Sequence, residues 1–138
     1  MTPILAEVFA ELKDTKSKNK KLKILHRFDN DPSFKEVCAL AVNPHIKWLL
    51  PEGEPPYNTT GQPDNETVIW TEIRRFYVFV ECDQSAGLSA AKREQIYIEM
   101  LESMHPKDAR FLIDLKNGEV KGITEKLIHE AWPGYLTY

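Results

Sequence analysis

The residues best suited to chemistry in this sequence are lysines clustered near its start. Residues 15–23, TKSKNKKLK, hold five lysines and no acidic residue in nine positions. Ammonium groups at this density suit a polyanion, because each one placed against a phosphate releases condensed counterions. The alternative is a solvated helix face, on which lysines only keep the surface polar. The spacing favours a phosphate-binding stretch over that alternative.

A second stretch of related character lies at residues 117–126, NGEVKGITEK. Its glycines would let the backbone approach a phosphate closely, its threonine can cap a following helix, and its lysines add charge. Ordinary helix capping is the other interpretation. Glu119 and Glu125 count against phosphate binding, because they would repel it. The candidate phosphate ligands in the two stretches are Thr15, Lys16, Ser17, Lys18, Lys20, Lys21, Gly118, Lys121, Gly122, Thr124 and Lys126.

The totals describe an ordinary globular chain without a general basic excess. The sequence has 138 residues, 42% hydrophobic and 28% charged, with a formal net charge of −3. This length predicts one domain over residues 1–138. Any anion site must therefore be a local patch. No apolar run approaches the ~20 residues of a membrane span, and no basic segment opens a signal peptide, so we expect a cytoplasmic protein that does not contact membranes.

Motifs for catalysis, metals and cofactors are missing from the sequence. It contains no P-loop, GxGxxG, GxSxG or HExxH motif. Its four histidines are scattered, without the spacing of metal ligands. Cys38 and Cys82 sit in apolar surroundings, which predicts buried, reduced thiols. We therefore expect a protein that is not an enzyme and has no catalytic residue, metal or cofactor.

The elements that would position the two lysine-bearing stretches are helices. Apolar residues at helical spacing predict an all-α, compact multi-helix domain, with N-caps at Thr15 or Ser17, at Ser89 and at Thr124, and with Pro32 and Pro106 at helix starts. The expected helices cover about residues 3–13, 17–28, 32–42, 67–82, 89–104, 106–117 and 124–131, with a short additional one after residue 44. The strand propensity of residues 76–80, FYVFV, is the alternative within the fourth of these.

One long loop interrupts the helical pattern. Residues 51–66, PEGEPPYNTTGQPDNE, hold four prolines, two glycines, four acids and no base. A connection of this length is often functional. Its acidity suggests a segment that binds a protein partner.

Residues 108–136, DARFLIDLKNGEVKGITEKLIHEAWPGYL, resemble the end of the N-terminal DNA-binding domain of ATP-dependent DNA ligases. In that family, a helix of the type EARFLVRL leads through a glycine-containing LRIG turn into another helix. Residues 4–44 resemble the opening helices of that domain, and residues 87–95, GLSAAKREQ, resemble a later helix entry. Ligases of the T-even phages are the most similar members, which would make this a stand-alone phage protein.

The resemblance implies a helical domain that grips duplex DNA across the minor groove, mainly through phosphates. A ligase also needs a nucleotidyltransferase domain with a KxDG motif, which this sequence lacks. The leading hypothesis is therefore a non-enzymatic accessory protein that binds duplex DNA without sequence preference. The alternative is a ligase-like helical module that binds a phage or host replication, transcription or defence protein.

Overall fold

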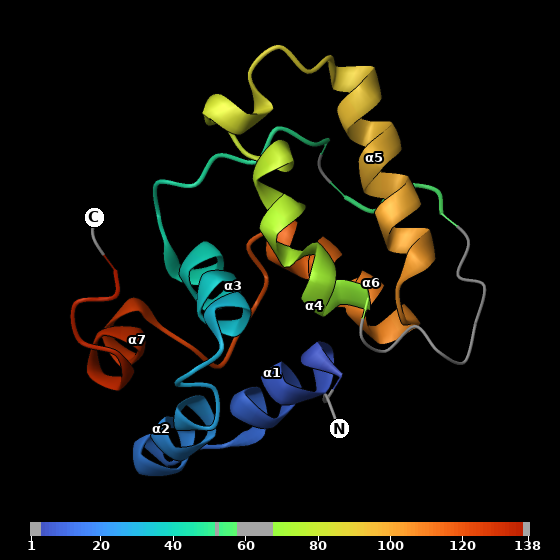
Figure 1. The fold of residues 1–138 in the computed structure, drawn as a ribbon. Helices are drawn as coiled ribbons and strands as arrows, with labels where there is room; N and C mark the ends of the chain where they lie inside the picture. Colours follow the sequence, from blue (N-terminus) through green and yellow to red (C-terminus); the bar gives the residue numbers. More distant parts are fainter. Residues whose placement is uncertain (1–3, 52, 58–67, 137–138) are drawn as a thin grey trace.

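Seven α-helices and two short 3₁₀ helices make up the regular structure of the described part of the chain (Figure 1). This computed structural model describes residues 4–51, 53–57 and 68–136, and has no β-strand within them. The predicted all-α fold is confirmed. The elements in chain order are α1 (Leu5–Asp14), α2 (Lys18–His26), α3 (Pro32–Val42), α4 (Val68–Glu72), η1 (Ile73–Phe79), η2 (Asp83–Ser85), α5 (Ala90–Ser103), α6 (Pro106–Lys116) and α7 (Glu125–Ala131).

Capping side chains begin several helices where the sequence predicted them. The Ser17, Ser89 and Thr124 hydroxyls accept hydrogen bonds from backbone N–H groups in the first turns of α2, α5 and α7. At the start of α3, the Asp31 carboxylate caps the helix, and Pro32 takes the first helical position. These side chains satisfy N–H groups that have no partner within the helix, which explains why helix starts were predictable.

The segment predicted as one helix over residues 67–82 differs in its described part, residues 68–82. That part forms α4 and then the tighter turns of η1, and from Val80 it becomes extended. Val80 forms an isolated antiparallel bridge with Trp48, flanked by hydrogen bonds from Leu49 N–H to the Phe79 carbonyl and from Glu81 N–H to the Lys47 carbonyl. This pairing ends the helix. It also replaces the short helix predicted after residue 44, because both backbones are extended where they pair.

A glycine ends α6 in the manner that the sequence predicted. Gly118 has φ +73°. Its N–H donates to the Leu115 carbonyl at 3.2 Å, and the next N–H, of Glu119, donates to the Asp114 carbonyl at 2.8 Å. This is the Schellman arrangement, which needs a left-handed residue after the helix. It turns the chain sharply toward the segment that precedes α7.

Every α-helix contributes buried apolar side chains to one cluster. Aromatic rings lie at its centre: the Phe9 ring is 5.4 Å from that of Phe34 and 4.7 Å from that of Phe111, centroid to centroid. Trp132 is buried, and its indole N–H donates to the Asp29 carboxylate. The tertiary contacts of this cluster bring α7 against α2 and α3, and α6 against α1.

The two cysteines are both free, and their burial differs. Cys38 is buried as predicted, and burial raises the pKa of its thiol. Cys82 is only half-buried, so the prediction was wrong for this residue. It lies just after the Val80 bridge, where the chain turns toward η2 near the surface, and its thiol donates to the Tyr77 carbonyl.

Candidate nucleic-acid interface

The first basic stretch forms the turn between α1 and α2 and the first two turns of α2. Lys16 lies in the turn, and both Lys18 and Lys20 lie in the first turn of α2, all three exposed. That turn contains no acidic residue. A helix start carries a partial positive charge from its unpaired N–H groups, and here the lysines add to it.

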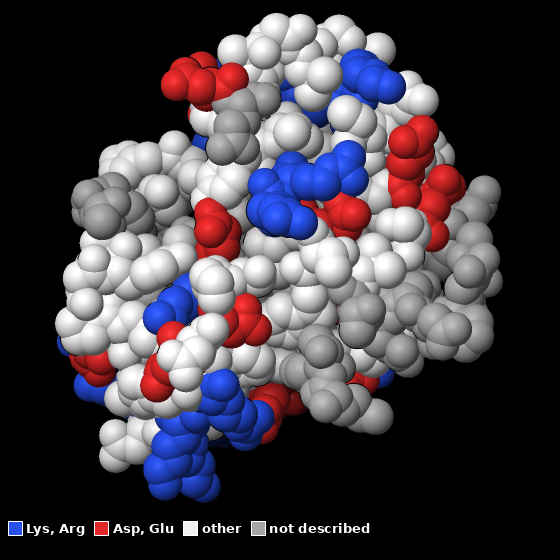
Figure 2. All heavy atoms as spheres, in the orientation of Figure 1, with Lys and Arg blue, Asp and Glu red and all other residues white. Residues whose placement is uncertain are grey.

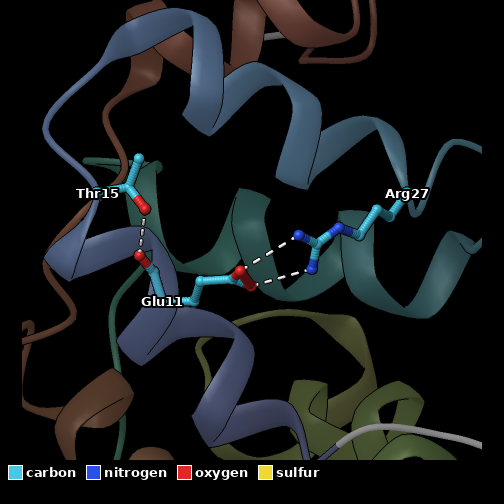
Figure 3. Close-up of polar contacts among 3 residues, drawn as sticks. All are labelled: Glu11, Thr15 and Arg27. Carbon is cyan, nitrogen blue, oxygen red and sulfur yellow. Dashed lines mark hydrogen bonds and ion pairs between the residues drawn. The ribbon is translucent and has the colours of Figure 1, made fainter.

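The Thr15 side chain is hydrogen-bonded within the protein, so its hydroxyl does not point freely into solvent. Its hydroxyl donates to the Glu11 carbonyl at 2.7 Å, at the end of α1 (Figure 3). The Glu11 carboxylate accepts two hydrogen bonds from the Arg27 guanidinium, at 3.0 and 3.2 Å (Figure 3). The Thr15 proton is therefore engaged within the turn. Its hydroxyl joins the end of α1 to the turn before α2, so Thr15 is not among the phosphate contacts that we propose.

The second stretch connects α6 to α7, and its two glycines do different things. Gly118 ends α6, with open space around its α-carbon. Gly122 has φ +96°, and a Cβ built on it would lie 2.7 Å from the Lys13 backbone nitrogen. The close backbone approach that Gly122 permits is thus to the end of α1. Thr124, two residues later, caps α7.

Two contacts across more than a hundred positions join the basic stretches. The Lys21 ammonium donates to the Gly122 carbonyl at 3.0 Å. The Lys18 ammonium pairs with the Glu130 carboxylate at 2.7 Å. Since α2 also packs against α7, the start of α2 and the segment leading into α7 lie side by side. Whether the two stretches share one face could not be judged from the sequence.

The two stretches line a common hollow of about 220 Å³. Four lysines and one glutamate contribute charge to its walls, a formal charge of +3. Five of the predicted ligands are not part of these walls: Thr15, Ser17, Lys20, Gly118 and Lys121. The Ser17 hydroxyl instead caps α2, and Lys121 lines a neighbouring groove. The lining residues are Lys16, Lys18, Lys21, Gly122, Thr124, Lys126, Leu127 and Glu130.

Acidic side chains limit the positive charge around the hollow. Figure 2 shows basic side chains gathered at the α2 end of one face, with acidic side chains close by. Glu130 is the acid in the hollow itself, whereas the sequence pointed to Glu119 and Glu125. The spacing of Lys126 and Glu130, four residues apart on one helix, was the signal that could have identified it.

The described part of the acidic loop is held against α6. The ammonium of Lys116, a buried residue, donates to the carbonyls of Pro51 and Gly53, each at 2.7 Å. The Arg110 guanidinium pairs with the Glu54 carboxylate at 3.2 Å. Residue 52 and residues 58–66 lie outside the described residues, so a partner-binding role for residues 51–66 stays a prediction.

Two further classes of site can be assessed over the described ranges. Within them, no group of three or more His, Cys, Asp or Glu side chains could hold a metal ion. No helix in that part of the chain has the length and apolar content needed to cross a membrane.

Comparison with known proteins assigns the chain to a family. Residues 8–122 match the family described as "Family of unknown function (DUF6433)". The chain is a DUF6433 family member. No curated protein and no solved structure matches the chain. The DUF6433 match begins within α1, includes the first basic stretch, and ends at Gly122 in the second. It therefore includes half of the residues that line the hollow, and α7, with Lys126 and Glu130, lies outside it.

Proposed function

We propose that this DUF6433 protein binds duplex DNA through its phosphates, without reading the base sequence, at the hollow between α2 and α7. One observation carries the proposal: two basic stretches about a hundred positions apart line one hollow with four lysines. A single lysine cluster is ordinary on a helix surface. Two that converge place several positive charges within reach of one phosphate backbone, which is where most DNA-binding free energy originates.

The side chains in the hollow suit phosphates better than base edges. Lysine is a compact point charge, whereas the bidentate recognition of guanine depends mainly on the fork of an arginine. None of the described residues that line the hollow is an arginine. The first turn of α2, which has no acidic residue, presents backbone N–H groups beside Lys16, one of which, that of Lys20, donates to the Ser17 hydroxyl. We therefore expect little discrimination between sequences.

The resemblance to the ligase DNA-binding domain supports the same target. It is strongest in residues 108–136, which run from within α6 through the turn at Gly118 to beyond the end of α7. This segment supplies five of the eight residues that line the hollow, from Gly122 to Glu130. The domain that it resembles grips duplex DNA mainly through phosphates, as proposed here.

A pair of matched double variants tests the proposal. Lys16→Ala with Lys126→Ala removes two exposed charges from the hollow, one from each stretch. Lys47→Ala with Lys92→Ala removes two exposed charges elsewhere. We expect the first double variant to weaken binding to two unrelated duplexes equally, roughly tenfold at ~50 mM salt, and to reduce the salt slope by about two. Fluorescence anisotropy over a salt series measures both quantities.

The control pair should leave the affinity and the slope near the wild-type values. If the wild-type protein shows no binding at ~50 mM salt, where phosphate contacts are strongest, the proposal is wrong. Equal losses in the two double variants would show that net charge, not the hollow, controls binding. A strong preference for one of the two duplexes would contradict the non-specific mode.

A further inference from the structure

The lysine-bearing first half of α2 is held in place by polar contacts and not by core packing. The helix buries Ile24 and Leu25, which both lie in its second half. None of the side chains of residues 18–21 is buried. Apolar packing therefore anchors the end of α2, whereas hydrogen bonds and ion pairs must orient its start.

Glu11, in the last turn of α1, is hydrogen-bonded to the chain at both ends of α2 (Figure 3). Its backbone carbonyl accepts the Thr15 N–H at 3.0 Å and the Thr15 hydroxyl at 2.7 Å, just before α2 begins. Its carboxylate accepts two hydrogen bonds from Arg27, the residue that caps the end of α2, at 3.0 and 3.2 Å. A single residue of α1 thus ties down the entry and the exit of α2.

The geometry of the Arg27–Glu11 pair distinguishes it from ion pairs that are joined by one bond. Both side chains are about half exposed, and at such exposure a pair with one bond contributes little. A guanidinium that donates two parallel hydrogen bonds to one carboxylate fixes the angle between the two side chains as well as their distance. The pair therefore restrains the direction of α2 relative to α1.

The other wall of the hollow rests on the same turn of α1. A Cβ built on Gly122 would lie 2.7 Å from the Lys13 backbone nitrogen and 2.9 Å from the Leu12 carbonyl carbon. The Gly122 carbonyl also accepts a hydrogen bond from the Lys21 ammonium of α2. The end of α1 is therefore the common support on which α2 and the segment leading into α7 meet.

We propose that Glu11 is a positioning residue for DNA binding: by tying both ends of α2 to α1, it places the α2 lysines opposite the segment that leads into α7. This role rests on the proposed function, because it concerns the same lysines. Neither Glu11 nor Arg27 lines the hollow, so the pair acts through α2. Phosphate binding to Lys18 would displace Glu130 and remove one tie of α2, whereas the tie to Glu11 would remain.

The negative charge of Glu11 makes the proposal testable, because electrostatics alone predicts the opposite result. Removing an acid near a phosphate site should strengthen DNA binding. For Glu11→Ala we expect weaker binding instead, by about threefold at ~50 mM salt, since fewer molecules hold the lysines in place. Asp14→Ala removes an equal charge from the same turn of α1 and should leave the affinity unchanged or raise it. Fluorescence anisotropy with one duplex measures both.

Two further variants separate geometry from charge. Arg27→Lys keeps the positive charge but loses the guanidinium fork, and we expect it to weaken binding about as much as Glu11→Ala does. The exchanged pair, Glu11→Arg with Arg27→Glu, keeps the net charge and can form the same two hydrogen bonds, so it should restore binding toward the wild-type affinity.

Hydrogen exchange without DNA gives an independent readout of the tie. The backbone amides of α2 should exchange faster in Glu11→Ala than in the wild type, while those of α5 should not change. Unchanged exchange in α2 would overturn the positioning role, as would an exchanged pair that binds no better than Glu11→Ala.

The outcome with DNA distinguishes this role from the proposed function. Binding by Glu11→Ala that is equal to or tighter than that of the wild type would overturn the positioning role alone, because Glu11 would then act only as a charge. Absence of binding by the wild-type chain would overturn the proposed function, and this role with it.

Discussion

At the scale of single residues, Asp108 stands out because its carboxylate is fully buried and incompletely satisfied. One oxygen accepts the Ala6 N–H at 2.9 Å and so caps α1 from another helix. The second oxygen has no hydrogen-bond partner among the described residues. Burial raises the Asp108 pKa to about 6, against the lowering effects of the Ala6 hydrogen bond and of His105. The ionised form therefore costs the folded state free energy.

We expect Asp108→Asn to stabilise the protein above pH 6. The folded state holds the Asp108 proton up to about pH 6, whereas the unfolded chain releases it near pH 4, so the free energy of unfolding falls with rising pH between these values. Each pKa unit corresponds to about 1.4 kcal/mol. Asparagine keeps the acceptor for Ala6 but buries an NH₂ group, so the net gain at pH 7.5 should be about 1–2 kcal/mol.

Urea denaturation at pH 4.5 and 7.5 measures this effect. The stability difference between the variant and the wild type should be small at pH 4.5 and favour the variant at pH 7.5. Asp14→Asn, at an exposed position, controls for the general effect of removing a carboxylate. A difference that is the same at both pH values would show that Asp108 is ionised throughout this range.

The glycines of the second stretch provide another comparison between single residues. Gly122→Ala would place a Cβ 2.7 Å from the Lys13 nitrogen, at a φ of +96°. Gly118→Ala meets open space at a φ of +73°. We expect about 1–2 kcal/mol of lost stability for Gly118→Ala, from backbone conformation alone. Gly122→Ala should lose more, because α1 must also move. Thermal unfolding measures both, and equal losses would contradict the close approach.

At the scale of elements, α2 and α7 form the candidate DNA site only because they are held together. The Lys18–Glu130 ion pair and the Lys21–Gly122 hydrogen bond join them. The same ion pair places a carboxylate where a phosphate would bind. Partly exposed ion pairs of this kind contribute little to the free energy of unfolding. Removing the Glu130 carboxylate should therefore change DNA binding more than the stability of the fold.

We expect Glu130→Gln to strengthen DNA binding several-fold at ~50 mM salt and to steepen the salt slope by about one, because it frees Lys18 for a phosphate. Glu94→Gln, on α5, removes an equal charge away from the hollow and is the control. Anisotropy titrations compare the two. Unchanged binding by the Glu130 variant would show that Lys18 does not contact DNA, without contradicting contacts from the other lysines.

The helix starts were predictable because capping is local. Ser17 bonds within three residues of itself, as Ser89 and Thr124 do. The end of the fourth predicted helix was not predictable, because Val80 is drawn into an extended bridge by Trp48, 32 positions away. Apolar periodicity in residues 67–82 carries no information about that partner.

At the scale of the whole molecule, the net charge of −3 does not favour DNA. Binding must come from a few local contacts, which makes it strongly dependent on salt. Four lysines line the hollow. If all four reach phosphates, the logarithm of the binding constant should fall with the logarithm of salt concentration with a slope of about −3.6.

We therefore expect the affinity to fall about a hundredfold between 50 and 200 mM salt. A potassium chloride series with one duplex measures this slope. Affinity that hardly changes over this range would indicate a mode of binding without phosphates. A much steeper slope would mean that lysines outside the hollow also contact the duplex.

The sequence by itself determined the helical class, most helix starts, the turn at Gly118 and the two basic stretches. These properties depend on residues within about one helical turn of each other, so they can be read locally. Only the tertiary structure decided that the stretches meet, that Glu130 faces Lys18, and that α1 and α6 leave a groove between them. Those features depend on contacts about a hundred positions apart, which arise when the apolar faces of the helices pack into one core.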